Sequence, residues 1–238
     1  MAFKQALGEP FNSTEYNKYL PESDPDGHGT HTASTAGGSF VHNVSVGELS
    51  YNTARGGVDV LSLSRGFDIP LYPEIDKHDL VYYGSFHGVA NGITVVCSAG
   101  NSGLKRYAAP GVDMLAARPP SPSARNGYAF SSGTSMAAPH VSGIVALLEV
   151  FASRLVSGCY TSALVTTAWR TDPHSGEPIL AELDITKIAD PFDFGGGLVN
   201  PNRARDPGLM FDLGIEDHTY YLCSIAYIET AINHLTQS

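Results

Sequence analysis

The stretch from Gly133 to Pro139 constrains the fold most, because it places a serine at the start of an apolar helix. The residues around Ser135 are small, and apolar residues then recur at three- and four-residue steps, as on a buried helix face: Val141, Ile144, Val145, Leu147 and Leu148. We expect Ser135 in or just before the first turn, where free N–H groups and the helix dipole stabilise an oxyanion. Pro139 is tolerated near a helix start, where a missing N–H costs little. A serine before an apolar run is also an ordinary helix N-cap, so the run alone leaves both interpretations open.

Two further segments carry residue types that a serine nucleophile needs. His28 stands between two glycines and opens a stretch of small residues. Asn101 lies in a glycine-containing turn after the strand-like run 93–97. Together with Ser135 they supply a base, a nucleophile and an amide donor. Each alone has a plainer explanation, since a histidine is often a packed or surface residue and an asparagine between glycines forms turns.

The three segments, in the order His, Asn, Ser, resemble those of the subtilisin-like serine proteases, the subtilases. Three blocks resemble the end of the catalytic domain in plant subtilases, and a fourth resembles their run toward a C-terminal β-domain: 166–168, 195–201, 206–209 and 217–223. The resemblance implies an α/β fold, a subtilisin-like parallel sheet with helices on both faces, incomplete here. It also implies an unassigned segment 1–22, a partial peptidase domain 23–212 and the start of a C-terminal region 213–238.

The resemblance gives each site residue a role in the hydrolysis of a polypeptide, and it implies no cofactor and no metal. His28 is the general base for Ser135 and later protonates the leaving amine. Asn101 donates its amide to the oxyanion, a contact worth about 10²- to 10³-fold in turnover in subtilisin itself. Ser64 and Gly66 fall where subtilases pair with the substrate backbone as an added strand. The remaining histidines that we considered are expected to be structural: His31, His42, His140 and His174.

The aspartate that would complete the triad is missing. In subtilisin it precedes the histidine by roughly 30 residues, whereas only 27 residues precede His28. Asp24 and Asp26 flank the histidine too closely to reach the far side of its ring. Loss of this aspartate costs about 3 × 10⁴ in turnover in subtilisin. We therefore expect only a trace of activity.

The intervals between the motifs are also short. Ser135 follows Asn101 by 34 positions, against roughly 65 in subtilisin, and Asn101 follows His28 by 73, against about 90. Blocks of the scaffold are missing, and strands without neighbours have open edges. Two alternatives to an enzyme of this family stay open. One is a non-catalytic remnant that binds peptides or a protease partner; the other is an α/β-hydrolase with Asp184 and His218 after Ser135, although Ala137 replaces the second glycine of that motif.

Composition narrows the partners and the location. The 238 residues suffice for one core, and the net charge of −10 argues against nucleic acid and anionic membranes as partners. No apolar stretch of about 18 residues is evident, so no membrane span is expected, and the first 20 residues lack an apolar signal core. The resemblance nonetheless implies an extracellular, apoplastic location, which the sequons at Asn12 and Asn43 suit. Three cysteines predict no disulfide framework, and Cys97 is expected to be buried.

Periodicity supports the α/β class. Strand-like runs cover 58–63 and 93–97, and helix-like stretches cover 78–90, 135–152 and 161–168. This alternation is typical of a parallel sheet covered by helices.

Overall fold

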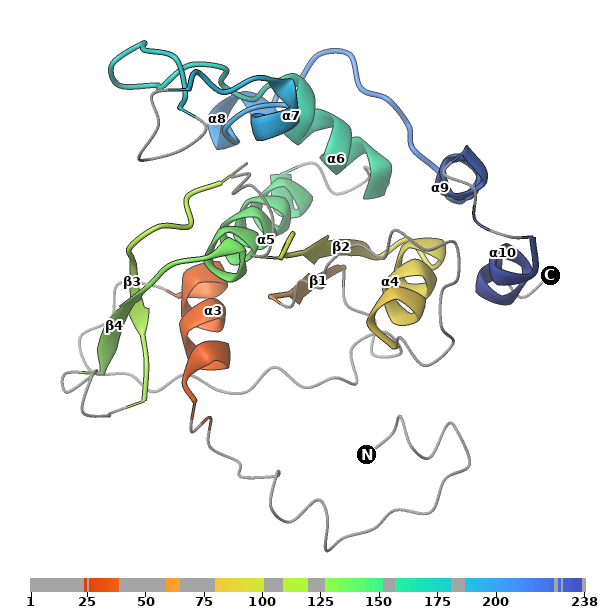
Figure 1. Cartoon of the computed structure of the whole chain (residues 1–238), viewed down its shortest axis with the longest axis horizontal. Coiled ribbons are helices and arrows are strands. Elements are labelled where there is room, and N and C mark those ends of the chain that lie inside the picture. Colours follow the sequence, from red (N-terminus) through yellow and green to blue (C-terminus); the bar gives the residue numbers. More distant parts are fainter. Residues whose placement is uncertain are drawn as a thin grey trace, which may run out of the picture.

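Two short parallel strands form the centre of the fold in the computed structural model of the chain (Figure 1). The structure describes residues 24, 26–38, 59–64, 80–100, 109–119, 127–151, 157–180, 187–224, 227 and 229–236. The elements with their bounds are α3 His28–Gly37, β1 Val60–Leu63, α4 Leu80–Ala90, β2 Thr94–Cys97, β3 Met114–Ala117, β4 Tyr128–Ser131, α5 Thr134–Phe151, α6 Ser157–Thr166, α7 Pro191–Phe194, α8 Pro201–Ala204, α9 Ile215–Ser224 and α10 Glu229–Thr236. In the parallel pair, Val60 lies opposite Thr94 and Leu63 lies opposite Cys97.

Helices cover both faces of the parallel pair, because successive side chains of a strand point to opposite sides. Val95 faces α4, where a Cβ added to Gly88 would lie 3.0 Å from the Val95 side chain. Val96 faces the other way and packs on a core cluster built from α5 and α6, whose centre is Val145 and Tyr160. The expected class, an incomplete α/β fold with helices on both faces of a parallel sheet, is confirmed.

An antiparallel pair of strands, β3 and β4, flanks α3 (Figure 1). His31 of α3 is only 1% exposed, and its Nε2 lies 2.9 Å from the Met114 carbonyl oxygen and 3.2 Å from that of Ala129. Because both neighbours are acceptors, Nε2 carries the proton and donates to them. His31 therefore joins α3 to both strands, and its expected structural role is confirmed.

The helix α5 is the core helix, and it corrects the expectation that no long apolar stretch exists. By length and composition this helix, with a mean hydropathy of 1.3, could cross a membrane. That is weak evidence for a span, because buried core helices have the same composition. Val145 is 1% exposed and Leu148 is buried with it in the core cluster, so the apolar side of α5 is used inside the protein.

Three glycines, 195–197, follow α7. They lie where the chain passes very close to Trp169, just after α6. Trp169 pairs with Leu198 through two backbone hydrogen bonds of 2.8 Å. A Cβ on Gly197, whose φ is +124°, would lie 2.2 Å from the Trp169 carbonyl oxygen. Only glycine fits there. One of the blocks that resemble plant subtilases is thereby explained by backbone packing.

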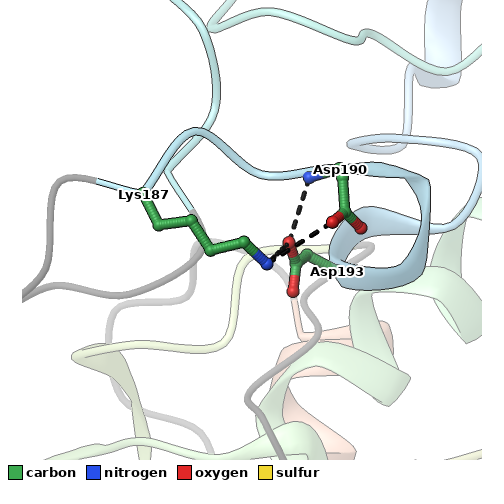
Figure 2. A network of polar contacts seen from close by, with 3 residues as sticks. All are labelled: Lys187, Asp190 and Asp193. Carbon is green, nitrogen blue, oxygen red and sulfur yellow. Dashed lines mark hydrogen bonds and ion pairs between the residues drawn. The ribbon is translucent and has the colours of Figure 1, made fainter.

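Charged side chains hold the loop that leads into α7 (Figure 2). Lys187 Nζ donates to Asp193 Oδ2 at 2.7 Å and lies 3.5 Å from Asp190 Oδ2. The backbone N–H of Asp190 donates to the same Asp193 oxygen at 3.0 Å. Because Asp193 is 8% exposed, its carboxylate depends on these donors for solvation.

Most expected elements are present with small shifts in their ends. The strands and the helices at 80–90 and 134–151 lie where periodicity predicts them, whereas α6 begins at Ser157, earlier than the predicted position 161. The segment 1–22, the sequons at Asn12 and Asn43, and His42 lie outside the described residues. Periodicity did not predict α3, β3 or β4, which consist of small residues or of only four residues each.

Cys97 is exposed at the end of β2, which corrects the expectation that it is buried. Partial desolvation raises the pKa of its thiol, slightly offset by a contact of 3.9 Å with the Ser85 hydroxyl. A raised pKa disfavours the thiolate, which is the nucleophilic form of cysteine. Cys159 and Cys223 are free as well.

Candidate active site

Ser135 is the second residue of α5, as its place before an apolar run predicted. Just before the helix, Gly133 has a φ of +146°, and its N–H donates to the Gly111 carbonyl at 2.7 Å. A Cβ on Gly111 would lie 2.8 Å from the Gly133 carbonyl oxygen, so two glycines let the segments touch. The serine is half-buried, and it lies in the first turn of α5, where the Met136 N–H donates to the Gly133 carbonyl oxygen at 3.0 Å.

The first turn of α5 lies at the carboxyl edge of the parallel pair. Beyond β1 and β2 the pairing continues, because Ser98 N–H donates to the Leu63 carbonyl at 3.0 Å. Thr134 Oγ1 then donates to the Gly100 carbonyl at 3.1 Å, which ties α5 to the turn after β2. Open α/β sheets bind their ligands at this edge. Asn101 and Gly66 lie outside the described residues, but their neighbours Gly100 and Ser64 both contact α5.

Ser64 and Ser135 are joined by two hydrogen bonds in opposite directions. The Ser135 hydroxyl donates to the Ser64 carbonyl oxygen at 3.1 Å. The Ser64 hydroxyl donates to the Ser135 carbonyl oxygen at 2.9 Å. The structure therefore brings the expected nucleophile to the expected substrate-binding strand. The role of the Ser64 side chain was missed by the sequence analysis, which assigned only the backbone of this segment to substrate.

His28 is the first residue of α3 and is exposed. No hydrogen bond joins it to Ser135, although the structure describes both residues. The two helices meet closely farther along, where a Cβ on Gly143 of α5 would lie 2.6 Å from the Ala36 carbonyl oxygen. Ala36 is near the opposite end of α3 from His28. The pairing of His28 with Ser135 stays a prediction from the motifs.

Asp24 caps the helix that His28 begins. Its Oδ1 accepts from Gly27 N–H at 2.9 Å, and its Oδ2 accepts from Thr30 N–H at 2.7 Å and from the Thr30 hydroxyl at 2.9 Å. Partial burial raises the pKa of this carboxyl, but the hydrogen bonds from Thr30 and Gly27, with help from the nearby His28 charge, lower it overall. Its acceptor oxygens serve the helix end, not the imidazole.

Asp26, the other acid beside the histidine, is used through its backbone. Its carbonyl oxygen accepts from Arg118 Nη2 at 2.7 Å and from Nε at 3.2 Å, and the residue is exposed. Over the described part of the chain, neither Asp24 nor Asp26 forms a hydrogen bond or ion pair with the His28 ring.

Other groups lie away from this edge. His140 Nδ1 lies 2.7 Å from the Met136 carbonyl oxygen within α5, and the backbone N–H of His174 donates to Asp172 in an exposed turn, so both serve local structure as expected. An open pocket of about 430 Å³ lies between α4 and α9, lined by Phe86 and Tyr220 among others. Of the alternative hydrolase pair, Asp184 lies outside the described residues and His218 is exposed on α9.

Comparisons with known proteins agree with the family resemblance. Residues 108–184 match the model of the subtilase family, Peptidase S8. Subtilisin-like protease SBT3.5 of Arabidopsis thaliana is 28% identical over 458 aligned positions, covering 97% of this chain and 59% of that protein. Subtilisin-like protease SBT3.15 of the same plant is 53% identical over 129 residues, which are 54% of this chain and 17% of that protein. The resemblance to plant subtilases is confirmed.

The lengths agree with missing blocks. An alignment of 458 positions for a chain of 238 residues contains long gaps, and the chain spans about three fifths of the curated relative SBT3.5.

Solved structures support the fold class. The prenylagaramide maturation protease PagA superposes with a TM-score of 0.53 at 20% identity, covering 79% of this chain and 84% of that one. MycP1 with its N-terminal propeptide removed superposes with a TM-score of 0.52 at 18% identity, covering 79% of this chain and 81% of that one.

Proposed function

We propose that this chain, a relative of the plant subtilisin-like proteases, is a serine endopeptidase of low activity in which Ser135 attacks the peptide carbonyl. The observation that carries the proposal is the place of Ser135, in the first turn of α5 at the carboxyl edge of the parallel pair. There the backbone N–H of Ser135 and the positive end of the helix dipole stabilise the oxyanion that forms. The Arabidopsis relatives, which are named as subtilisin-like proteases, support the same chemistry.

The other roles follow from the motifs. His28 takes the proton of the Ser135 hydroxyl and passes it to the leaving amine. Asn101 adds an amide donor for the oxyanion. The polypeptide substrate pairs as an added strand along the segment of Ser64 and Gly66. By the same resemblance, the peptidase domain spans 23–212 and acts outside the cell.

In the described part of the chain no carboxylate bonds to the His28 ring, and losing the orienting aspartate costs about 3 × 10⁴ in turnover in subtilisin, so low turnover is expected. Asp24 supports this, because its carboxylate is engaged by Gly27 and Thr30. Without a carboxylate on the far side of its ring, the His28 tautomer is not held. The hydroxyl of Ser135 also has to leave the Ser64 carbonyl before it can donate to a base.

One observation favours a second function, a non-catalytic peptide-binding protein. The Ser135 hydroxyl donates to the carbonyl of the substrate-binding strand and has no hydrogen bond with His28. Such a protein would keep the strand-pairing edge while the serine serves only as a structural partner of Ser64.

A fluorophosphonate probe on the intact chain separates the two functions. We expect slow labelling of wild type that is absent in Ser135→Ala and unchanged in Ser132→Ala, because the Ser132 hydroxyl serves only Asp113. Cleavage of a casein reporter should show the same pattern. Labelling and cleavage that equal those of Ser135→Ala would refute the enzyme and support the peptide-binding function, which direct binding of an extended peptide would then test.

A further inference from the structure

Pro139 has no N–H to donate to the carbonyl oxygen of Ser135, four positions earlier in α5. In an α-helix this oxygen accepts the N–H of the residue four positions ahead, and here that residue is a proline. From the sequence alone, Pro139 is expected near the helix start, where a missing N–H costs little. The structure corrects this, because α5 begins at Thr134 and Pro139 is its sixth residue, inside the helix and buried.

Ser64 supplies the missing donor from another element. Its hydroxyl donates to the Ser135 carbonyl oxygen at 2.9 Å. The proline ring also crowds the carbonyl four residues earlier and tilts it outward, away from the helix axis. The tilted Ser135 carbonyl lies against the end of β1. The Ser64 hydroxyl at that strand end therefore donates the hydrogen bond that the proline cannot donate.

The register of β1 against α5 places Ser64 there. The side chains of residues 60, 62 and 64 lie on the same side of the strand, because successive side chains point to opposite sides. Val60 packs on the cluster that contains Val145, and Ser62 accepts from the Ser142 hydroxyl at 2.8 Å. Ser64 then reaches Ser135, so the strand and the helix run past each other in opposite directions. A change of one residue in register would place Leu63 at the nucleophile instead.

We propose that Ser64 is a positioning residue for the nucleophile: its hydroxyl replaces the helix N–H that Pro139 lacks and thereby fixes the main chain of Ser135. This inference rests on the proposed function, because it assigns Ser64 a role toward Ser135 as a nucleophile. The Ser64 backbone pairs with substrate and its side chain holds the residue that attacks, so one residue sets the distance between them. A loss of this bond lets the first turn of α5 move relative to the bound peptide.

The first experiment tests the carbonyl assignment without using activity. Urea unfolding is measured for wild type, Ser64→Ala, Pro139→Ala and the double variant. Alanine at 139 restores the N–H that the Ser135 carbonyl normally accepts, so the midpoint shift caused by Ser64→Ala should fall to less than half in the Pro139→Ala background. An equal shift in both backgrounds would overturn the proposal, because Ser64 would then not substitute for that N–H.

The second experiment tests positioning by the second-order rate of fluorophosphonate labelling. Ser64→Ala should label roughly 2- to 10-fold more slowly than wild type, the effect expected from one neutral hydrogen bond. Ser64→Thr keeps a hydroxyl and should restore most of the rate. Ser62→Ala is the matched control, since it removes a contact between the same strand and helix while Ser142 keeps its bond to the Ala138 carbonyl at 3.0 Å.

The outcomes distinguish this proposal from the proposed function. Equal losses in Ser64→Ala and Ser62→Ala, or no rescue by Ser64→Thr, would overturn the positioning role while labelling at Ser135 still supports the enzyme. A wild type that does not label would refute the enzyme. In that case a positive urea result would show that Ser64 is a structural partner of α5, which overturns its role toward a nucleophile.

Discussion

Replacing Asp24 by alanine should destabilise the chain by about 1–2 kcal/mol at pH 7. The carboxylate caps the start of α3 through three hydrogen bonds, from Gly27 N–H and from the N–H and hydroxyl of Thr30. Loss of an aspartate cap costs about 0.5–2 kcal/mol, and partial burial of these donors places Asp24 in the upper half of that range. The matched control is Asp26→Ala, which leaves its backbone contact with Arg118 intact and should change the free energy of unfolding by less than about 0.5 kcal/mol.

The effect should depend on pH in a defined direction. Hydrogen bonds lower the pKa of Asp24 in the folded chain below its unfolded value of about 3.9. The stabilisation is therefore complete above the unfolded pKa and is lost as the pH falls through the folded pKa. Wild type and Asp24→Ala should differ fully at pH 7 and pH 5, and the difference should shrink as the pH falls below the unfolded pKa of about 3.9.

Urea unfolding followed by far-UV circular dichroism at pH 7, 5 and 2.5 measures both claims. The slope of the free energy against urea has to stay constant between variants for the comparison to hold. The capping argument is wrong if Asp24→Ala and Asp26→Ala are equally stable at pH 7. A gap that stays constant down to pH 2.5 would show instead that the alanine acts through something other than the ionised carboxylate.

Two further substitutions test the packing of the scaffold. Gly143→Ala should cost about 1–3 kcal/mol, because the new Cβ meets the Ala36 carbonyl of α3, whereas Gly84→Ala in α4, where a Cβ meets nothing within 4 Å, should be neutral or stabilising; equal midpoints in urea would contradict this. Lys187→Met should lower the thermal midpoint by removing the cation from the carboxylate of Asp193, and the loss should shrink in 1 M NaCl. The hydrogen bond to Asp193 raises the pKa of Lys187, so the stabilisation by this ion pair is present at neutral pH and is lost as the pH rises through the folded pKa. A fall in the thermal midpoint that is the same at low and high salt would argue against the ion pair.

Local pattern in the sequence determined the helices α4, α5 and α6 and the sheet class, but not α3. The three- and four-residue spacing after Ser135 predicted α5 and the place of the serine in its first turn, and the apolar runs predicted both parallel strands. These features depend on residues close in sequence, whose periodicity is the same wherever the element packs. The order of the motifs also sufficed to predict the resemblance to the plant subtilases, since it requires only the residues and their sequence.

Only the tertiary structure decided which atoms meet at the site. Ser64 and Ser135 are 71 residues apart, and their two hydrogen bonds depend on the register of β1 against α5, which no local pattern encodes. The use of Asp24 as a helix cap was not evident from the sequence, because its donors Gly27 and Thr30 form a helix end only once α3 is in place. Cys97 is exposed because it lies at the end of β2. Pro139 removes a helix N–H from the Ser135 carbonyl because α5 begins as early as Thr134. Contacts between distant segments arise from packing of the whole chain, and so local pattern determined the longer helices and the parallel strands while the fold determined the chemistry between them.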